Sequence, residues 1–318
     1  MKQPKSTNIC KDIHSFEEIL ERYPCIDTDE GIYQSSEELQ LNLHQVEIHQ
    51  RFDKGHLRSY FEAAHHLEHD NLVPVEASFI VKKPPYHRYY WFTPVTKSDD
   101  EIDIMSLPDQ QKDSVVLQFL SVITFLHNKG YYLGTTDPSS FQLELNYGSI
   151  HLHICEYHLN TPLDLAMNYA MISPEQLKMT QITDARTDFW ILGVYLFWLY
   201  TGQYPFGSRN QKTTNQQIAD RIKNETISTH LDSVKEPFRS IISRCLSVIP
   251  SDRWEYISDI STYYKNHIID HSIDQEKIRS HTKRIRSFRK KSKPVNISFV
   301  IFWLLLAIFL GYVLNQMT

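Results

Sequence analysis

The chain has 318 residues, of which 41% are hydrophobic and 22% charged, so it can form one large folded domain or two smaller ones. Nine of the 33 basic residues lie from Lys277 onward, and all 38 acidic residues lie before it. Residues 1–276 therefore carry 24 basic and 38 acidic residues, a net charge of −14. Such an acidic segment argues against nucleic-acid binding. The four cysteines show no paired spacing, which argues against a disulfide framework and favours a reducing compartment.

Strand patterns dominate the first third of the chain. Residues 1–14 lack the apolar stretch of a signal peptide and are expected to form an N-terminal tail. Leu39–Phe52, "LQLNLHQVEIHQRF", alternates apolar and polar residues and predicts a strand. A helix is expected over Leu57–Glu68. The stretches "NLVPVEASFIV" and "YHRYYWFTPV" then predict two more strands, because they are rich in Val, Phe, Tyr and Trp.

Helical patterns take over from Gln110 and continue to about Asn266, interrupted by one short hairpin. Asp188–Tyr200, "DFWILGVYLFWLY", is apolar nearly all round, which indicates a helix buried on every side and too short to span a membrane. Strands followed by helices predict an α+β protein with two lobes. We expect the N-terminal lobe to cover residues 15–94 and the C-terminal lobe residues 95–268.

Three motifs in the second half of the chain resemble those of protein kinases. "TDFWILGVYLFWLYTGQYPFG" resembles the central helix and the loop that follows it, "ISPEQL" resembles the end of the activation segment, and "CLSVIPSDRW" resembles the motif with a buried arginine. Their order and spacing match the family over roughly residues 15–266. The resemblance implies a kinase-like fold, an ion pair between Glu175 and Arg253, and a role for Asp188 in capping the backbone of the catalytic loop.

The stretch "GYYLGTTDPSS" occupies the place of the catalytic loop, aligned on Gly130 and Pro138. In this alignment Thr135 replaces the catalytic aspartate, Ser140 replaces the metal-binding asparagine, and Asp137 replaces the lysine. A threonine cannot accept the substrate's proton as a carboxylate does, and a serine is a poor magnesium ligand. The resemblance therefore implies that the loop has kept its architecture and lost its chemistry.

The phosphate-binding positions differ from the family pattern as well. "YPCIDTDEGIY" keeps only one glycine, Gly31, where the family has a glycine-rich loop, and it adds acidic residues that would repel phosphate. The lysine of the neighbouring strand falls on His49, a weak phosphate ligand. The glutamate that pairs with this lysine falls nearest Tyr60, with Glu62 two residues away.

Glu156, in "LHICEYHL", stands at the metal-binding aspartate and retains a carboxylate. Binding of ATP and magnesium therefore stays open, against the alternative of a solvated acid in a diverged loop, and we expect no cofactor. Glu156 and Glu175 are only 19 positions apart, which leaves little room for aligning a substrate peptide.

Three potential zinc ligands, His151, His153 and Cys155, alternate along one predicted strand, and His158 follows. The kinase resemblance makes this an ordinary strand, and the chain has 16 histidines throughout. We therefore predict no metal site here.

A membrane anchor is predicted at the C-terminal end. Residues 297–314, "ISFVIFWLLLAIFLGYVL", carry no charge and are long enough to cross a bilayer, and only four residues follow. Residues 269–296 form a basic juxtamembrane segment whose cluster at 277–293 holds nine Lys and Arg, which places the N-terminal lobes on the cytoplasmic side. This cluster could also bind anionic lipids, although a role in topology alone explains it equally well.

These patterns together predict a membrane-anchored pseudokinase that acts as a scaffold or regulatory subunit for protein partners. A nucleotide-binding switch is one alternative. An atypical phosphotransferase or nucleotidyl transferase, with Asp137 as base and Glu156 on the metal, is another. The layout is similar to that of pseudokinase subunits of bacterial secretion machines, and a eukaryotic tail-anchored regulator fits equally well.

Overall fold

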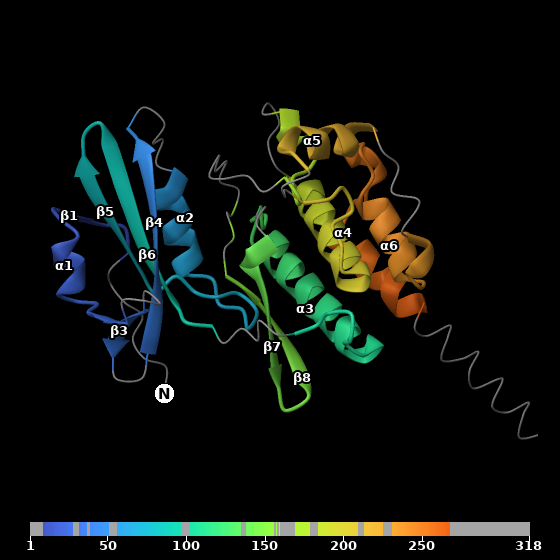
Figure 1. Cartoon of the computed structure of the whole chain (residues 1–318), viewed down its shortest axis with the longest axis horizontal. Coiled ribbons are helices and arrows are strands. Elements are labelled where there is room, and N and C mark those ends of the chain that lie inside the picture. The colour runs from blue at the N-terminus through green and yellow to red at the C-terminus, as the bar shows by residue number, and fades with distance from the viewer. Residues whose placement is uncertain are drawn as a thin grey trace, which may run out of the picture. The chain divides into compact units, whose positions relative to one another are not determined.

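The computed structural model describes residues 9–27, 32–36, 39–50, 56–96, 102–134, 138–155, 157, 159, 169–178, 184–208, 213–224 and 231–267. The chain divides into one compact unit of residues 1–263 and a second unit that begins at Tyr264. The elements below belong to the first unit, in which a β-rich lobe precedes a helical lobe (Figure 1). This order confirms the predicted two-lobed α+β architecture.

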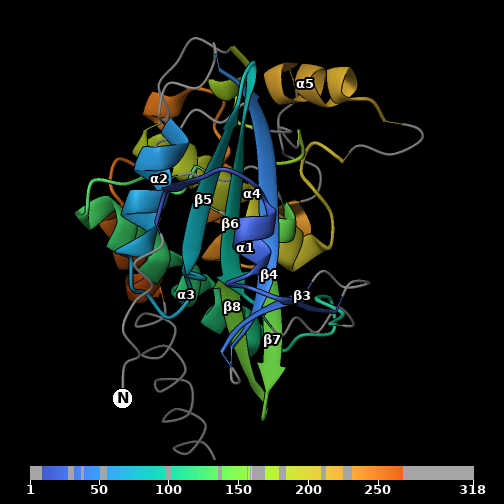
Figure 2. The same cartoon turned by 90° about the vertical axis from the view of Figure 1, so that its left-hand side faces the viewer.

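The N-terminal lobe is built on a six-stranded sheet with the spatial order β1-β5-β6-β4-β3-β2. Its elements are β1 (Lys11–Ile13), α1 (Glu17–Leu20), β2 (Cys25–Asp27), β3 (Ile32–Ser36), β4 (Leu39–His49), α2 (His56–His65), β5 (Ala77–Lys83) and β6 (Tyr86–Pro94). β1 pairs in parallel with β5, and the other neighbouring strands are antiparallel. Figure 2 looks onto this sheet, with β5, β6 and β4 side by side.

The two faces of the sheet pack against different helices. β4 and β6 pair without a break along nine residue pairs, so alternate side chains lie on opposite faces. One face forms a buried cluster with α1 that includes Leu41 and Phe92. The other face carries Trp91, whose ring lies 5.4 Å from that of Phe61 on α2. Figure 1 accordingly shows α1 and α2 on opposite sides of the sheet.

The sheet begins earlier than the sequence predicted, because β1 lies within the segment expected to be an N-terminal tail. Ile13 is buried in the core cluster, and the backbone N–H of Cys10 donates a 2.8 Å hydrogen bond to Ser78 Oγ. A three-residue strand shows too little alternation to be recognised from its pattern.

The C-terminal lobe is mainly helical and is organised around one central helix. Its elements are α3 (Asp109–Asn128), the hairpin β7 (Phe141–Asn146) and β8 (Ser149–Ile154), α4 (Ala185–Thr201), α5 (Asn215–Asn224), α6 (Phe238–Cys245), and short 3₁₀ turns at Pro138–Ser140, Gln176–Lys178, Leu231–Ser233 and Pro250–Asp252. Twelve of the 17 residues of α4 are buried, which confirms the predicted helix surrounded by protein. Asp184 caps its start by accepting from the Arg186 N–H, and Gly202 ends it in a left-handed conformation with φ 70°.

The segment between α2 and β5 joins the two lobes. The Asn71 side chain is buried, and its Nδ2 donates to Gln118 Oε1 at 2.7 Å and to the Leu152 carbonyl at 2.8 Å. Leu72 forms a parallel β-bridge with Ile154. This segment is therefore fixed to α3 and to β8 by hydrogen bonds that satisfy a buried amide.

Within the described part of the chain, no helix combines the length and the apolar character needed to cross a lipid bilayer. The predicted span at 297–314 and the basic cluster at 277–293 lie outside the described residues, and both stay predictions.

Candidate functional site

A buried carboxylate holds the segment that leads into the degenerate catalytic loop. Asp188, in the first turn of α4, has no exposed surface. Its Oδ2 accepts from the Leu133 N–H at 2.8 Å and its Oδ1 from the Gly134 N–H at 3.1 Å. The structure thus brings Asp188 to the backbone that the resemblance implied, directly before residues 135–137.

A third hydrogen-bond partner of this carboxylate is His127, at the end of α3, whose Nε2 lies 2.9 Å from Asp188 Oδ2. Because a carboxylate accepts, the imidazole Nε2 carries the proton in this contact. Sequence reasoning missed this histidine, since one among 16 histidines gives no signal of its own. Its contact extends the anchor from the loop backbone to the helix that precedes it.

The degenerate positions of the loop are only partly described. Thr135, Asp137 and Glu156 lie outside the described residues. Ser140 is buried at the end of a 3₁₀ turn, and its carbonyl accepts from the Cys155 N–H at 2.8 Å. Ser140 therefore lies beside Cys155, the residue directly before Glu156, which the alignment assigns to the metal-binding aspartate.

The predicted ion pair is present in the interior of the C-terminal lobe. Arg253 donates from Nη1 to Glu175 Oε1 at 2.7 Å and from Nη2 to Glu175 Oε2 at 2.8 Å. Burial by itself would raise the pKa of Glu175, but the hydrogen bonds and the charge of Arg253 lower it below its ordinary value. The carboxylate is therefore held in its charged form.

Further contacts satisfy the remaining polar atoms of this pair. Arg253 also donates to the Ser247 and Arg186 carbonyls, both at 2.8 Å, and Thr187 Oγ1 donates to Glu175 Oε1 at 3.0 Å. A buried pair is stable only when such additional hydrogen bonds compensate for desolvation. Through these bonds the pair connects the segment at Glu175 with the start of α4 and with the 3₁₀ turn at Pro250–Asp252.

The strand position assigned to the phosphate-binding lysine, His49, does not face α2. His49 shares its face of β4 with Leu41, the face that packs on α1, and its ring contacts Tyr86. His44 lies on the opposite face, where it stacks on Trp91 at 5.2 Å. The face of β4 toward α2 therefore carries His44, and His49 lies on the opposite face.

The helix contributes no carboxylate to this face. Tyr60 is buried, and its ring lies 6.0 Å from that of Tyr157. Glu62, the sole acidic residue of α2, is exposed. Tyr60, the residue nearest the aligned glutamate, therefore makes an aromatic contact with Tyr157 of the other lobe.

The segments that connect the two lobes are bonded to the C-terminal lobe by side chains. Tyr157, which follows Glu156, is buried, and its hydroxyl donates to the Val73 carbonyl at 3.1 Å. Burial raises the pKa of this phenol, so it stays protonated and can donate. Thr96, after β6, donates to the side-chain oxygen of Gln142, and its hydroxyl lies 3.8 Å from Cys155 Sγ.

The potential zinc ligands each have a separate partner. His151 Nε2 lies 3.2 Å from the Asp70 carbonyl, and His153 Nε2 lies 2.9 Å from Glu144 Oε2. No group of three potential metal ligands converges among the described residues, and His158 lies outside them. Because His151 and His153 share one face of β8, their ring centres lie 4.6 Å apart.

Comparison with known proteins supports the fold. Residues 156–265, about a third of the chain, match the family model described as "Protein kinase domain". The crystal structure of Rad53 1-466 in complex with AMP-PNP is similar in fold, with a TM-score of 0.54 and 19% sequence identity. The match covers 74% of this chain and 63% of that chain. No curated protein sequence matches. The chain thus has a kinase-like two-lobed α+β fold.

Proposed function

We propose that this chain is a pseudokinase that acts as a regulatory binding subunit or scaffold at a membrane, without phosphotransfer. The observation that carries the proposal is the composition of two elements. β4 contains no lysine or arginine at any position, and the only carboxylate of α2, on Glu62, is exposed. Whichever register is chosen, the pair of charges that positions the phosphates in kinases is missing from these elements.

The consequence is electrostatic. Kinases stabilise a nucleotide almost entirely by placing cations and metal ions around its phosphates, because the protein does little covalent chemistry. The face of β4 toward α2 carries His44 between Asn42 and Val46, and the asparagine position of the loop is a buried serine, Ser140. These side chains supply neither a permanent positive charge nor a carboxylate for magnesium.

The contacts between the lobes support a binding role that does not require nucleotide. Tyr157 donates to Val73, and Thr96 donates to Gln142. Such side-chain bonds fix the segments that connect the lobes to the C-terminal lobe through the protein itself. A stable arrangement of the lobes presents fixed surfaces to a partner, which is what a scaffold needs.

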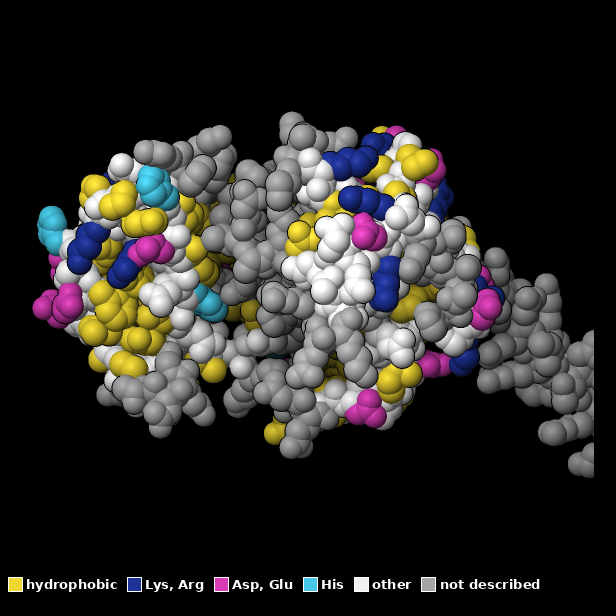
Figure 3. All heavy atoms as spheres, turned by 45° about the horizontal axis from the view of Figure 1, so that its top comes forward, with side chains coloured by type: hydrophobic (Ala, Val, Ile, Leu, Met, Phe, Trp, Pro, Cys, Tyr) yellow, Lys and Arg dark blue, Asp and Glu magenta, His cyan; other side chains and the backbone are white. Residues whose placement is uncertain are grey.

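The membrane part of the proposal rests on the sequence. Residues 297–314 are uncharged over a length suited to a bilayer, and the cluster at 277–293 is basic. On the face shown in Figure 3, basic and acidic side chains are interspersed among those described, without the basic field that nucleic acid requires. Protein partners at the membrane are therefore the proposed ligands.

Thermal unfolding of the full chain in detergent, with and without millimolar ATP and Mg²⁺, tests the proposal. We expect no shift, whereas a ligand at about 100 times its dissociation constant would stabilise the native state by about 2.7 kcal/mol. A shift that Glu156→Ala abolishes would contradict the proposal and favour a nucleotide-binding switch. If the chain also transfers phosphate or a nucleotide and Asp137→Ala loses this transfer, the result would favour the atypical transferase.

A further inference from the structure

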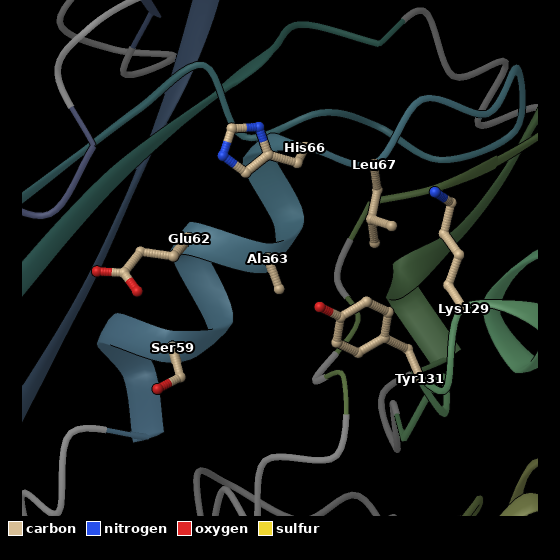
Figure 4. Close-up of a pocket in the computed structure, with 7 residues that line it drawn as sticks. All are labelled: Ser59, Glu62, Ala63, His66, Leu67, Lys129 and Tyr131. Atoms are coloured by element: carbon tan, nitrogen blue, oxygen red, sulfur yellow. The ribbon is translucent and has the colours of Figure 1, made fainter.

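A cavity of about 540 Å³ opens between α2 and the residues that follow α3. Its lining comprises Ser59, Glu62, Ala63, His66, Leu67, Lys129 and Tyr131 (Figure 4). Its volume lies in the range of small-molecule and peptide sites. Glu62 lies two residues from the aligned helix glutamate and Tyr131 begins the stretch before the degenerate loop positions; the other lining residues have no place in the nucleotide site described above.

The lining has two sources, each fixed by local structure. Ser59, Glu62, Ala63 and His66 are spaced at i, i+3, i+4 and i+7, so they form one stripe along α2. On the other side the chain reverses at Gly130, which has φ 78°, and the Tyr131 and Lys129 N–H groups bond back to the Leu126 carbonyl. This turn places both residues against the stripe.

The polar groups of the cavity have no polar partners in the described part of the protein. Neither the Glu62 carboxylate nor the Lys129 ammonium takes part in an ion pair there, and the hydroxyls of Ser59 and Tyr131 make no hydrogen bond there. The Lys129 ammonium lies 5.2 Å from the centre of the Phe125 ring. Polar groups that line a cavity without protein partners are available to a ligand.

The two charges stand at opposite sides of the cavity. In Figure 4 the Glu62 carboxylate lies at one side and the Lys129 ammonium at the other, with Ala63 and Tyr131 between them. The buried Leu67 adds an apolar wall. A complementary ligand therefore has a cation at one end, an anion at the other, and an apolar middle that offers hydrogen bonds.

We infer that this cavity docks a short peptide segment of a partner protein that carries one basic and one acidic side chain. The inference rests on the proposed function, since it gives the regulatory subunit its binding site. A peptide fits the chemistry because its backbone can bond to Ser59, His66 and Tyr131 while its side chains pair with Glu62 and Lys129. Binding there joins α2 to the C-terminal lobe through the ligand.

Titration of the full chain in detergent with capped tetrapeptides, followed by saturation-transfer NMR, tests the inference. The probes are acetyl-Lys-Ala-Leu-Glu-amide and its two like-charged relatives, with Glu or Lys at both ends. We expect the mixed-charge peptide to bind the wild-type chain about fivefold more tightly than either relative, since a partly exposed charge pair contributes at most about that factor.

Two charge reversals predict opposite changes of preference. Glu62→Lys should make the peptide with two glutamates the best ligand, and Lys129→Glu the peptide with two lysines. Glu21→Lys and Lys223→Glu, which reverse exposed charges outside the cavity lining, are matched controls and should keep the wild-type ranking. No binding of any peptide, or an unchanged ranking in both cavity variants, overturns the inference.

The outcome is separable from that of the proposed function. A nucleotide-induced thermal shift with the peptide rankings as expected would overturn the pseudokinase proposal and leave the peptide site in place. Absence of both the shift and the peptide preference would overturn the peptide site and leave the pseudokinase proposal in place.

Discussion

Glu175 and Arg253, which are 78 positions apart in the chain, meet through two parallel hydrogen bonds of 2.7 and 2.8 Å in the interior of the C-terminal lobe. The arginine is 1% exposed and the glutamate 6%, so neither charge is shared with solvent. Such a pair has a particular energetic signature. Its removal as a whole costs little, whereas the loss of one partner leaves an uncompensated charge in the interior.

Arg253→Ala should therefore lower the free energy of unfolding by roughly 3–5 kcal/mol. Urea denaturation of the full chain in detergent measures this loss. The double variant Glu175→Gln with Arg253→Met removes both charges and should recover a large part of it. A single variant that loses less than about 1 kcal/mol would contradict the role assigned to this pair.

Asp188→Ala should destabilise the C-terminal lobe by about 2–4 kcal/mol, because it leaves the N–H groups of Leu133 and Gly134 without their acceptor. His127→Phe removes only one of the three contacts and should cost less. Hydrogen exchange of residues 131–134 provides the measurement. If both variants leave exchange there unchanged, the carboxylate does not anchor this segment.

The motifs that made the fold predictable are those whose spacing reports long-range contacts. Asp188, Glu175 and Arg253 lie in segments with a family pattern, and the structure places each in the expected contact. The apolar run of α4 similarly predicted a buried helix, because a helix without a polar face must be surrounded by protein.

The features that the sequence did not reveal depend on strand pairing or on single contacts. His49, which the alignment assigns to the strand lysine, lies five residues from His44, an odd number, and therefore on the other face of the sheet. Only the pairing of β4 with β6 reveals which face meets α2. The short strand β1 and the contact of His127 with Asp188 were missed because neither leaves a periodic signal.

The stability of the chain should decrease below about pH 6.5 in a way that depends on His69. Its Nε2 lies 3.0 Å from Ser121 Oγ, and its Nδ1 accepts from the Asn71 N–H at 3.1 Å, which requires a neutral ring. Burial beside α3 lowers the pKa of His69, although the neighbouring Asp70 opposes this effect.

Both states are neutral above the ordinary histidine pKa of about 6.5, so the contribution is fully present there. As the pH falls through this value toward the folded-state pKa, the unfolded chain binds the proton first and the stability contribution is lost. His69→Gln should show a shallower decline between pH 7 and pH 5 in thermal unfolding scans. Because other histidines also titrate, the difference between the two chains is the quantity to compare, and identical slopes would refute the assignment.

Gly193→Ala should destabilise the chain by about 1–3 kcal/mol, although alanine in place of a glycine inside a helix ordinarily stabilises. A Cβ at this position of α4 would lie 2.7 Å from Cys245 Cβ and 2.8 Å from Leu246 Cγ. The double variant Gly193→Ala with Leu246→Ala gives this Cβ more room. A measurement in which Gly193→Ala alone raises the melting temperature would show that α4 and α6 pack less closely.

Two arginines in the middle of residues 297–314 should release the chain from membranes. Leu305→Arg and Ile308→Arg each cost about 2.5–3.5 kcal/mol at the centre of a span, enough together to prevent insertion. Alkaline carbonate extraction should leave the wild-type chain in the membrane pellet and move the double variant to the supernatant. Val295→Arg with Asn296→Arg, placed just ahead of the span, is the matched control, since added positive charge at the cytoplasmic flank is tolerated and should leave the chain in the pellet. Extraction of the wild-type chain along with the double variant would remove the membrane part of the proposed function.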